Sequence, residues 1–232
     1  MDEPSLPEWP PQRRVVRPED AEQRLLAFGM TLDVISKSIE VGDTARRRVM
    51  QPVYPKTFAG VTMWAETLSE WRRQMLKRRV NYEIGRTRGY ETLYSVEREA
   101  AFTVVAGDSF TGIDGSRDPK LKRAKGVITS QRVALNKQKS TFLGVQLALI
   151  PTPDKNLPPD EACDTWFLIV RPTKMEIRLE LSRPIRIDGD NIVSGYDERI
   201  LLPPVQISGA IEPITPDDLE DDSDGGDDLV GH

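Results

Sequence analysis

The chain has 232 residues and a net charge of −5, and its 38% hydrophobic and 30% charged residues are typical of a soluble protein with a buried core. The sequence contains no run of about 18 apolar residues, so no transmembrane helix is predicted. The acidic, proline-rich start lacks the apolar stretch of a signal peptide, and we therefore expect a cytoplasmic protein. The only cysteine is Cys163 and the only histidine is the last residue, His232, which excludes internal disulfides, Cys/His zinc sites and histidine-activated nucleophiles.

The first part of the chain predicts an extended arm followed by two short helices. Residues 1–17 contain four prolines and Trp9, a composition typical of a disordered, extended arm. Residues 18–29 begin with a proline and two acidic residues, which suit the first turn of a helix. A second helix is predicted over 31–42, with Gly42 as its end.

A longer amphipathic helix is predicted over residues 58–80. Its apolar residues recur at the spacing of a helix and form one stripe, while charged residues occupy the other sides. The stripe consists of Trp64, Leu68, Trp71 and Met75.

In the second half of the chain the hydrophobic pattern changes to the alternation of strands. Residues 127–139 fit either a helix or a strand, and we favour a helix. The predicted strands are 90–95, 101–107, 145–150, 165–172, 175–182 and 199–207. Helices followed by strands predict an α+β fold with N-terminal helices and then an antiparallel or mixed sheet. We expect a single α+β domain over 18–210, helical in 18–80 and sheet-rich in 90–210.

Acidic residues concentrate at the C-terminal end. The segment "DDLEDDSDGGDD", residues 217–228, has eight acidic residues and no basic one, which leaves residues 1–216 with a net charge of about +3. Such a segment cannot bury enough apolar surface to order itself, so we expect residues 211–232 to form a disordered acidic tail.

Basic residues concentrate in two runs. Residues 71–88 contain seven Lys or Arg and one acidic residue, and residues 112–139 contain eight and two. If the fold brings both runs to one face, they form a positive patch that binds nucleic acid through its phosphates. The residues predicted to contact phosphate are Arg72, Arg73, Arg78, Arg79, Lys120, Lys122, Arg123 and Lys125.

The segment "GDSFTGIDGSRDPKLKRAKG", residues 107–126, combines four glycines with five Lys or Arg. The glycines allow the backbone to approach a phosphate, but the spacing matches neither GxxxxGK[ST] nor GxGxxG. Three interpretations stay open: a phosphate cradle, a flexible basic loop that contacts a polyanion, and a solvated surface loop.

Residues 19–42 also have the outline of a helix-turn-helix motif, with a glycine between two short helices. The second helix would present Asp33, Ser36, Lys37 and Glu40, a set poorly suited to DNA. A plain helical hairpin is the alternative.

Enzymatic activity would have to depend on carboxylates. The segment "EIR" at 176–178 resembles the acid-x-lysine of metal-dependent nucleases, with Asp164 on the preceding strand. Arginine in place of the lysine argues against this, because a guanidinium cannot act as a base. A metal-dependent hydrolase would need Asp108, Asp164 and Glu176 to meet in one cleft.

The segments "GVTMWAETLSEWRRQM" (60–75), "FTVVAGDSFTG" (102–112) and "MEIRLELSRPIRIDGDNIVSGYDERILLPP" (175–204) resemble uncharacterised proteins of actinobacterial genomes and their mobile elements. The resemblance covers most of residues 20–205. It implies one structural unit and a phage, plasmid or integrated-element context, and it implies no activity, ligand or site residue.

The leading interpretation is a non-enzymatic accessory protein that binds DNA or RNA through its basic surface and is modulated by its acidic tail. The sequence predicts no cofactor, no catalytic residue and no metal site. The alternative is an interaction or structural component of a mobile-element system, which contacts a protein partner through the Trp9 arm or the acidic tail. A metal-dependent nuclease or hydrolase is the third interpretation.

Overall fold

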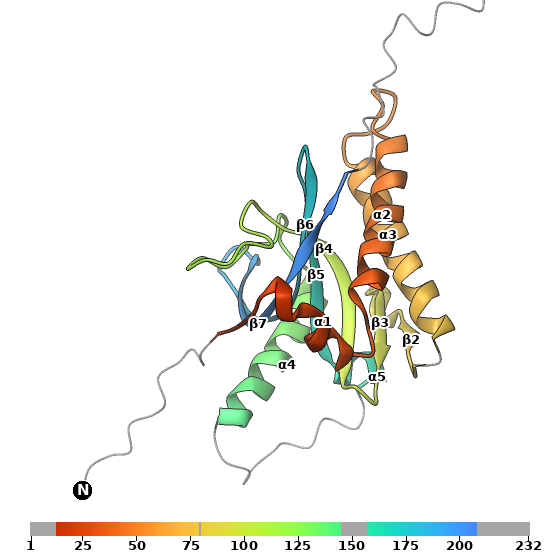
Figure 1. Ribbon diagram of the computed structural model, residues 1–232. Helices are drawn as coiled ribbons and strands as arrows, with labels where there is room; N and C mark the ends of the chain where they lie inside the picture. Colours follow the sequence, from red (N-terminus) through yellow and green to blue (C-terminus); the bar gives the residue numbers. More distant parts are fainter. Residues whose placement is uncertain (1–12, 79, 145–156, 208–232) are drawn as a thin grey trace, which may run out of the picture.

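Helices dominate the N-terminal part of the protein, whose computed structural model describes residues 13–78, 80–144 and 157–207 (Figure 1). The three helices are α1 (Pro18–Leu26), α2 (Leu32–Arg48) and α3 (Phe58–Lys77). The long amphipathic helix predicted over 58–80 is therefore confirmed. No helix in these described ranges is both long and apolar enough to cross a membrane.

All described strands belong to one mixed sheet with the order β1-β7-β6-β5-β4-β3-β2. Strand β1 is parallel to β7 and β4 is parallel to β5, while the other neighbours are antiparallel. The α+β class and the order of helices before sheet are thus as the sequence predicts. The strands are β1 (Arg14–Val16), β2 (Glu83–Gly85), β3 (Thr92–Ser95), β4 (Ala100–Ala106), β5 (Asp164–Pro172), β6 (Glu176–Ile187) and β7 (Val193–Gln206).

Helices cover both faces of the sheet (Figure 1). Helices α1, α2 and α3 pack on one face, where Trp71 meets Phe102 and Trp166 in the larger core. Helix α4 (Val127–Gly144) packs on the opposite face, where its Val133 contacts a smaller core around Phe167. The alternation of Trp166 and Phe167 between the two cores follows from the two-residue period of a strand.

The parallel pair of β4 and β5 sets the layout of one end of the sheet. The connection between the two strands contains a loop, residues 107–126, and then α4. Ala106 lies opposite Val170, so the carboxyl ends of both strands finish side by side.

Strand β7 finishes at this same end of the sheet. Pro172 of β5 pairs with Ile177 of β6, and Glu176 pairs with Gln206, the last residue of β7. The amide of Ile207 then donates to the Met175 carbonyl at 3.2 Å. The described part of the chain therefore ends at the same end of the sheet as β4 and β5, with β6 between β7 and β5.

The prediction that Gly42 ends the second helix is wrong, because α2 continues to Arg48. Gly42 lies where α2 and α3 cross. A Cβ atom there would lie 2.0 Å from Thr67 Oγ1 and 2.9 Å from the Met63 carbonyl oxygen. The glycine permits close packing of two long helices, which outweighs its cost of about 1 kcal/mol in helix propensity. Because α2 is 17 residues long and packs along α3, the pair forms a helical hairpin.

Several short elements were not predicted, because three or four residues show no periodicity. These are β1, β2, the 3₁₀ turn Thr87–Gly89 and α5 (Pro159–Ala162). The strand predicted at 145–150, residues 1–12 of the predicted arm and the acidic tail lie outside the described residues. The arm was predicted to extend to residue 17, but Arg14–Val16 form β1 and pair with β7, so its last residues belong to the sheet.

Candidate nucleic-acid interface

A cleft of about 1000 Å³ lies between the tip of the α2–α3 hairpin and the carboxyl ends of β4 and β5. Hairpin residues between 46 and 64 form one wall, and residues 104–106 and 170–172 of the sheet form the other. Residues from 122 to 125 close a third side. We call this space, with these lining segments, the hairpin cleft. Carboxyl ends of parallel neighbours are a frequent place for ligands in sheets that contain them.

The loop after β4 is folded against the sheet, and this brings its basic half to the cleft. Gly107 pairs with Leu121 in an isolated bridge, and the amide of Lys122 donates to the Ala106 carbonyl at 2.9 Å. A Cβ atom at Gly107 would lie 2.1 Å from Thr111 Oγ1, so the turn needs a glycine. The chain therefore doubles back at the end of β4 and places Lys122 beside the cleft.

The other half of this loop is tied to the rest of the protein by its acidic residues. Asp118 pairs with Arg13 at 2.5 Å, and Asp114 pairs with Arg17 at 3.2 Å. The amide of Gly112, which has a φ of 70°, donates to Glu180 at 2.8 Å. This glycine amide is thus used inside the protein, which argues against the phosphate-cradle interpretation of the loop.

The lining of the hairpin cleft contains cations and no acidic residue. Arg46 is paired with Asp43. The remaining five lining cations form no ion pair with any residue in the described ranges: Lys56, Lys122, Arg123, Lys125 and Arg171. Burial and the neighbouring Arg123 lower the pKa of Lys125, as expected where positive charges gather without a counter-charge.

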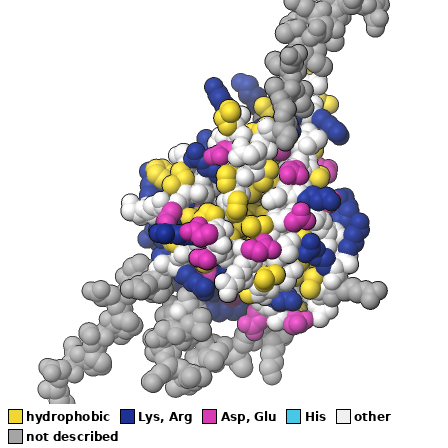
Figure 2. Space-filling view, viewed as in Figure 1, with side chains coloured by type: hydrophobic (Ala, Val, Ile, Leu, Met, Phe, Trp, Pro, Cys, Tyr) yellow, Lys and Arg dark blue, Asp and Glu magenta, His cyan; other side chains and the backbone are white. Residues whose placement is uncertain are grey.

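Aromatic and apolar side chains of the hairpin share this space with the cations. Tyr54 and Trp64 line the cleft and are 41% and 37% exposed. The ring of Tyr54 stacks on Phe58 with centroids 5.3 Å apart. Figure 2 shows hydrophobic and basic side chains next to one another at the upper end of the molecule, where the hairpin tip lies. Exposed aromatic rings among cations are the combination with which single-stranded nucleic acids are bound.

Three of the eight predicted phosphate contacts meet in the hairpin cleft, namely Lys122, Arg123 and Lys125. Lys120, from the same run, pairs with Asp188 at 3.3 Å instead.

The predicted contacts on α3 lie elsewhere. Arg72 donates to the Thr92 carbonyl at 2.7 Å and pairs with Glu91, and Arg73 pairs with Glu70. Arg78 is exposed at the C-terminal end of α3, roughly 20 Å along the helix from Trp64 at its cleft end. Arg79 is outside the described residues. The two basic runs therefore do not form one patch in the described part of the chain.

Several cleft residues were not singled out from the sequence. Arg46, Lys56 and Arg171 come from three separate segments, and Trp64 was assigned to the buried stripe of its helix. One signal was available: residues 50–58 hold two prolines, two aromatic residues and a lysine, which is unusual for a simple helix connection.

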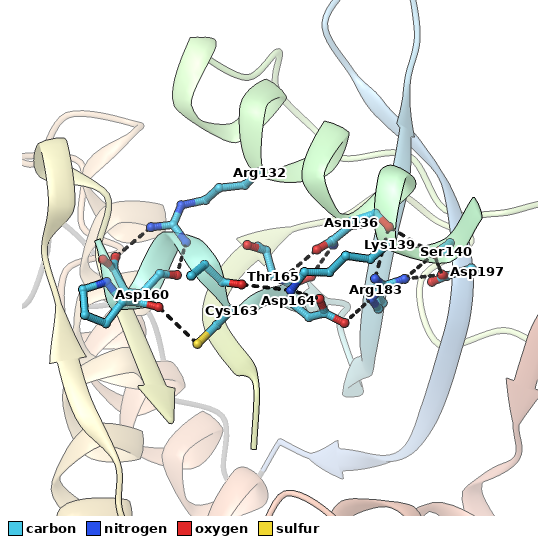
Figure 3. A network of polar contacts seen from close by, with 12 residues as sticks. Arg132, Asn136, Lys139, Ser140, Asp160, Cys163, Asp164, Thr165, Arg183 and Asp197 are labelled. Atoms are coloured by element: carbon cyan, nitrogen blue, oxygen red, sulfur yellow. Dashed lines mark hydrogen bonds and ion pairs between the residues drawn. The ribbon is translucent and has the colours of Figure 1, made fainter. Parts of the chain in front are cut away.

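A second polar cluster lies between α4 and the sheet (Figure 3). Asn136 exchanges hydrogen bonds with the backbone of Thr165 at 2.8 and 2.9 Å. Lys139 and Arg183 both bind the Asp164 carboxylate, at 2.8 and 2.9 Å. Arg183 also pairs with Asp197. These groups satisfy one another, so the cluster holds α4 on the sheet.

Figure 3 also shows a buried pair from α4 to α5, in which Arg132 binds Asp160 at 2.7 Å. Cys163 lies close by, and its thiol donates to the Pro159 carbonyl at 3.2 Å. Burial raises the pKa of Cys163 to about 11, which keeps the sulfur protonated and unreactive at neutral pH.

The carboxylates required for a metal-dependent hydrolase do not meet. Asp164 begins β5, whereas Asp108 follows the end of the parallel strand β4, so a strand length of roughly 20 Å separates them. Glu176 pairs with Arg178 on its own strand. Among the described residues, no group of three His, Cys, Asp or Glu side chains is placed to hold a metal ion.

The alternative interpretation expects a protein partner at the Trp9 arm or the acidic tail. Trp9, with residues 1–12 of the arm, and the acidic tail lie outside the described residues. In comparisons with known proteins, the chain matches no family model, no curated protein and no solved structure.

Proposed function

We propose that the protein is a non-enzymatic binding protein that holds single-stranded nucleic acid in the hairpin cleft. The observation that carries this proposal is the lining itself: five cations without an ion pair in the described structure, two exposed aromatic rings and no carboxylate. Lys122, Arg123, Lys125 and Arg171 would contact phosphates, and Tyr54 and Trp64 would stack on bases.

The shape of the site favours a single strand over a duplex. The cations and rings line the walls of a cleft, so a ligand must enter with its backbone and bases both accessible. A single strand can do so, whereas a duplex keeps its bases stacked inside. Contact with phosphates and ring faces implies little sequence preference and strong dependence on salt.

A protein partner is the second candidate, supported by a different observation. The connection between α2 and α3 exposes apolar side chains at its tip, with Met50 59% and Val53 81% exposed. Exposed apolar groups beside polar ones are typical of protein-binding surfaces. Such a partner would cover the tip, and its binding would not be weakened when the lysines at 122 and 125 are replaced.

The proposal is tested by fluorescence anisotropy with a labelled single strand and a labelled duplex, at low and moderate salt. The full chain and a chain ending at Pro216, which keeps every described residue, are compared with a Lys122→Gln/Arg123→Gln/Lys125→Gln variant of each. We expect micromolar binding of the single strand that weakens steeply with salt. The triple variant should bind more weakly, with a salt slope shallower by roughly 2, because three phosphate contacts are lost.

The matched control removes three positive charges from outside the cleft. Arg73→Gln/Arg78→Gln/Arg86→Gln changes side chains that line no part of it. Equal losses in the two triple variants would show that net charge alone drives binding. Absence of binding by either chain at low salt would overturn the proposal and favour the protein partner.

A further inference from the structure

Except at Arg46, the positive charge of the hairpin cleft is not balanced by any carboxylate of the described residues. Elsewhere in the described ranges, arginines that line buried or half-buried sites are paired with carboxylates: Arg13, Arg24, Arg132, Arg183 and Arg199. In the cleft, Lys122, Arg123, Lys125 and Arg171 have no such partner. Lys122 and Arg123 are exposed, while Lys125 and Arg171 are half-buried. Like charges gathered without a counter-charge repel one another, and a negative ligand would relieve this repulsion.

The chain itself carries a segment of the opposite charge. Residues 217–228 hold eight acidic residues and no basic one. A carboxylate-rich segment offers the same groups to lysine and arginine as a phosphate backbone does, namely closely spaced negative oxygens.

The path of the chain brings this segment to the cleft. Strand β7 ends at the same end of the sheet as the carboxyl ends of β4 and β5, which form the sheet wall of the cleft, and β6 lies between β7 and β5. Only residues 208–216 separate Ile207 from the acidic segment. Nine residues can span up to roughly 30 Å. The wall of the cleft includes Pro172, which is two strands away from the end of β7, a distance of about 10 Å that this length covers.

We infer that residues 217–228 occupy the hairpin cleft of their own chain and that nucleic acid must displace them to bind. The inference rests on the proposed function for its competition with nucleic acid, while the contact between tail and cleft stands independently of it. A tether this short gives an effective concentration in the millimolar range. A segment that binds the cleft with a dissociation constant of about 100 μM would then weaken the binding of nucleic acid about tenfold.

The experiment uses the full chain and a full-length variant with a neutral tail, in which the eight acidic residues between 217 and 228 become Asn or Gln. Length and chain path are the same in both proteins. Anisotropy with a labelled single strand should show about tenfold tighter binding by the neutral-tail variant at low salt. This difference should shrink as salt rises, because the contact between tail and cleft is itself screened.

A readout without nucleic acid tests the contact directly. A carbodiimide joins a lysine amine to a nearby carboxylate in an amide bond, with the carboxylate oxygen leaving on the urea by-product. In the dilute wild-type chain, we expect intramolecular crosslinks from the tail to Lys56, Lys122 or Lys125, and none to Lys77 at the far end of α3. Persistence of the crosslinks on dilution distinguishes contact within one chain from contact between two copies.

The outcomes separate the two proposals. If the wild-type chain and the neutral-tail variant bind nucleic acid equally tightly, and no crosslink to the cleft forms, the tail inference is overturned and the proposed function is left intact. Crosslinks to the cleft without binding of nucleic acid by either protein would overturn the proposed function and leave the tail contact in place. Crosslinks spread over Lys77 as well as the cleft lysines would show non-specific attraction and overturn the inference.

Discussion

The ion pair of Arg199 on β7 and Glu180 on β6 is fully buried, with both side chains 0% exposed. Arg199 Nε donates to Glu180 at 3.0 Å, and its guanidinium also reaches the Ile113 carbonyl and Asp118. Glu180 accepts in addition from the Gly112 amide. The pair therefore joins β6 and β7 to the loop that follows β4.

At the scale of single residues, we predict that Glu180→Gln lowers the free energy of unfolding by roughly 3 kcal/mol. The substitution leaves the buried charge of Arg199 with only the more distant Asp118, and an uncompensated buried charge is strongly destabilising. Urea denaturation measures the effect. The control is Glu176→Gln on the same strand, which breaks the exposed pair with Arg178 and should cost less than about 1 kcal/mol. Equal losses in the two variants would contradict the prediction.

The sequence predicted individual cations of the site in part. Lys122, Arg123 and Lys125 were identified because they lie close together in the chain. Arg72 and Lys120 were chosen on the same ground, but each has a partner that the sequence does not place near it, such as Asp188 for Lys120. Local charge density cannot distinguish a paired cation from a free one, because the partner comes from tertiary contact.

At the scale of elements, the close crossing of α2 and α3 sets the position of the hairpin tip. We predict that Gly42→Ala destabilises the protein by about 1–3 kcal/mol, because the new methyl group would overlap Thr67 and the Met63 carbonyl. Thr67→Ala in the same chain should recover part of the loss, since it removes the nearest atom. Thermal or urea denaturation of the single and double variants measures both effects.

Gly60→Ala is the matched control on α3. A Cβ atom at Gly60 would meet no atom within 4 Å, so the substitution should stabilise the helix by up to about 1 kcal/mol through propensity alone. Destabilisation by both substitutions would mean that the hairpin, rather than the crossing, is sensitive to change.

Long elements were predictable because their hydrophobic period extends over many residues, as in α3 and β5. The end of α2 was not, since Gly42 has one meaning in an isolated helix and another where a second helix lies against it. The walls of the hairpin cleft could not be predicted from the sequence either, because they come from the α2–α3 connection and from strand ends that meet only in the folded sheet.

At the scale of the whole molecule, we predict that stability falls as the pH rises above about 8.5. Burial raises the pKa of Cys163 to about 11 and that of Tyr90 to about 12. In the unfolded chain these groups lose their protons near pH 8.5 and 10. The folded protein thus holds protons that the unfolded chain releases, and the unfolded state gains up to about 1.4 kcal/mol for each pH unit and each group.

Urea midpoints measured between pH 8 and pH 11 test this dependence. Cys163→Ala should flatten the first part of the decline, between about pH 8.5 and 10, because in the unfolded chain the thiol loses its proton at lower pH than the tyrosine does. A midpoint independent of pH over this range would contradict the assignment of these groups to buried sites.

The pairing of β1 with β7 determines when the sheet can be completed during synthesis of the chain. Arg14 lies opposite Glu198, so the first strand of the chain gains its neighbour only when the last strand has been synthesised. Helices α1 to α3 likewise emerge long before β5 and β6, whose apolar face they cover. The nascent chain therefore exposes an unpaired strand and three amphipathic helices for most of translation. Contacts this distant in sequence slow folding, so the core is expected to be completed only once β7 has been synthesised, and the partly folded chain exposes apolar surface until then.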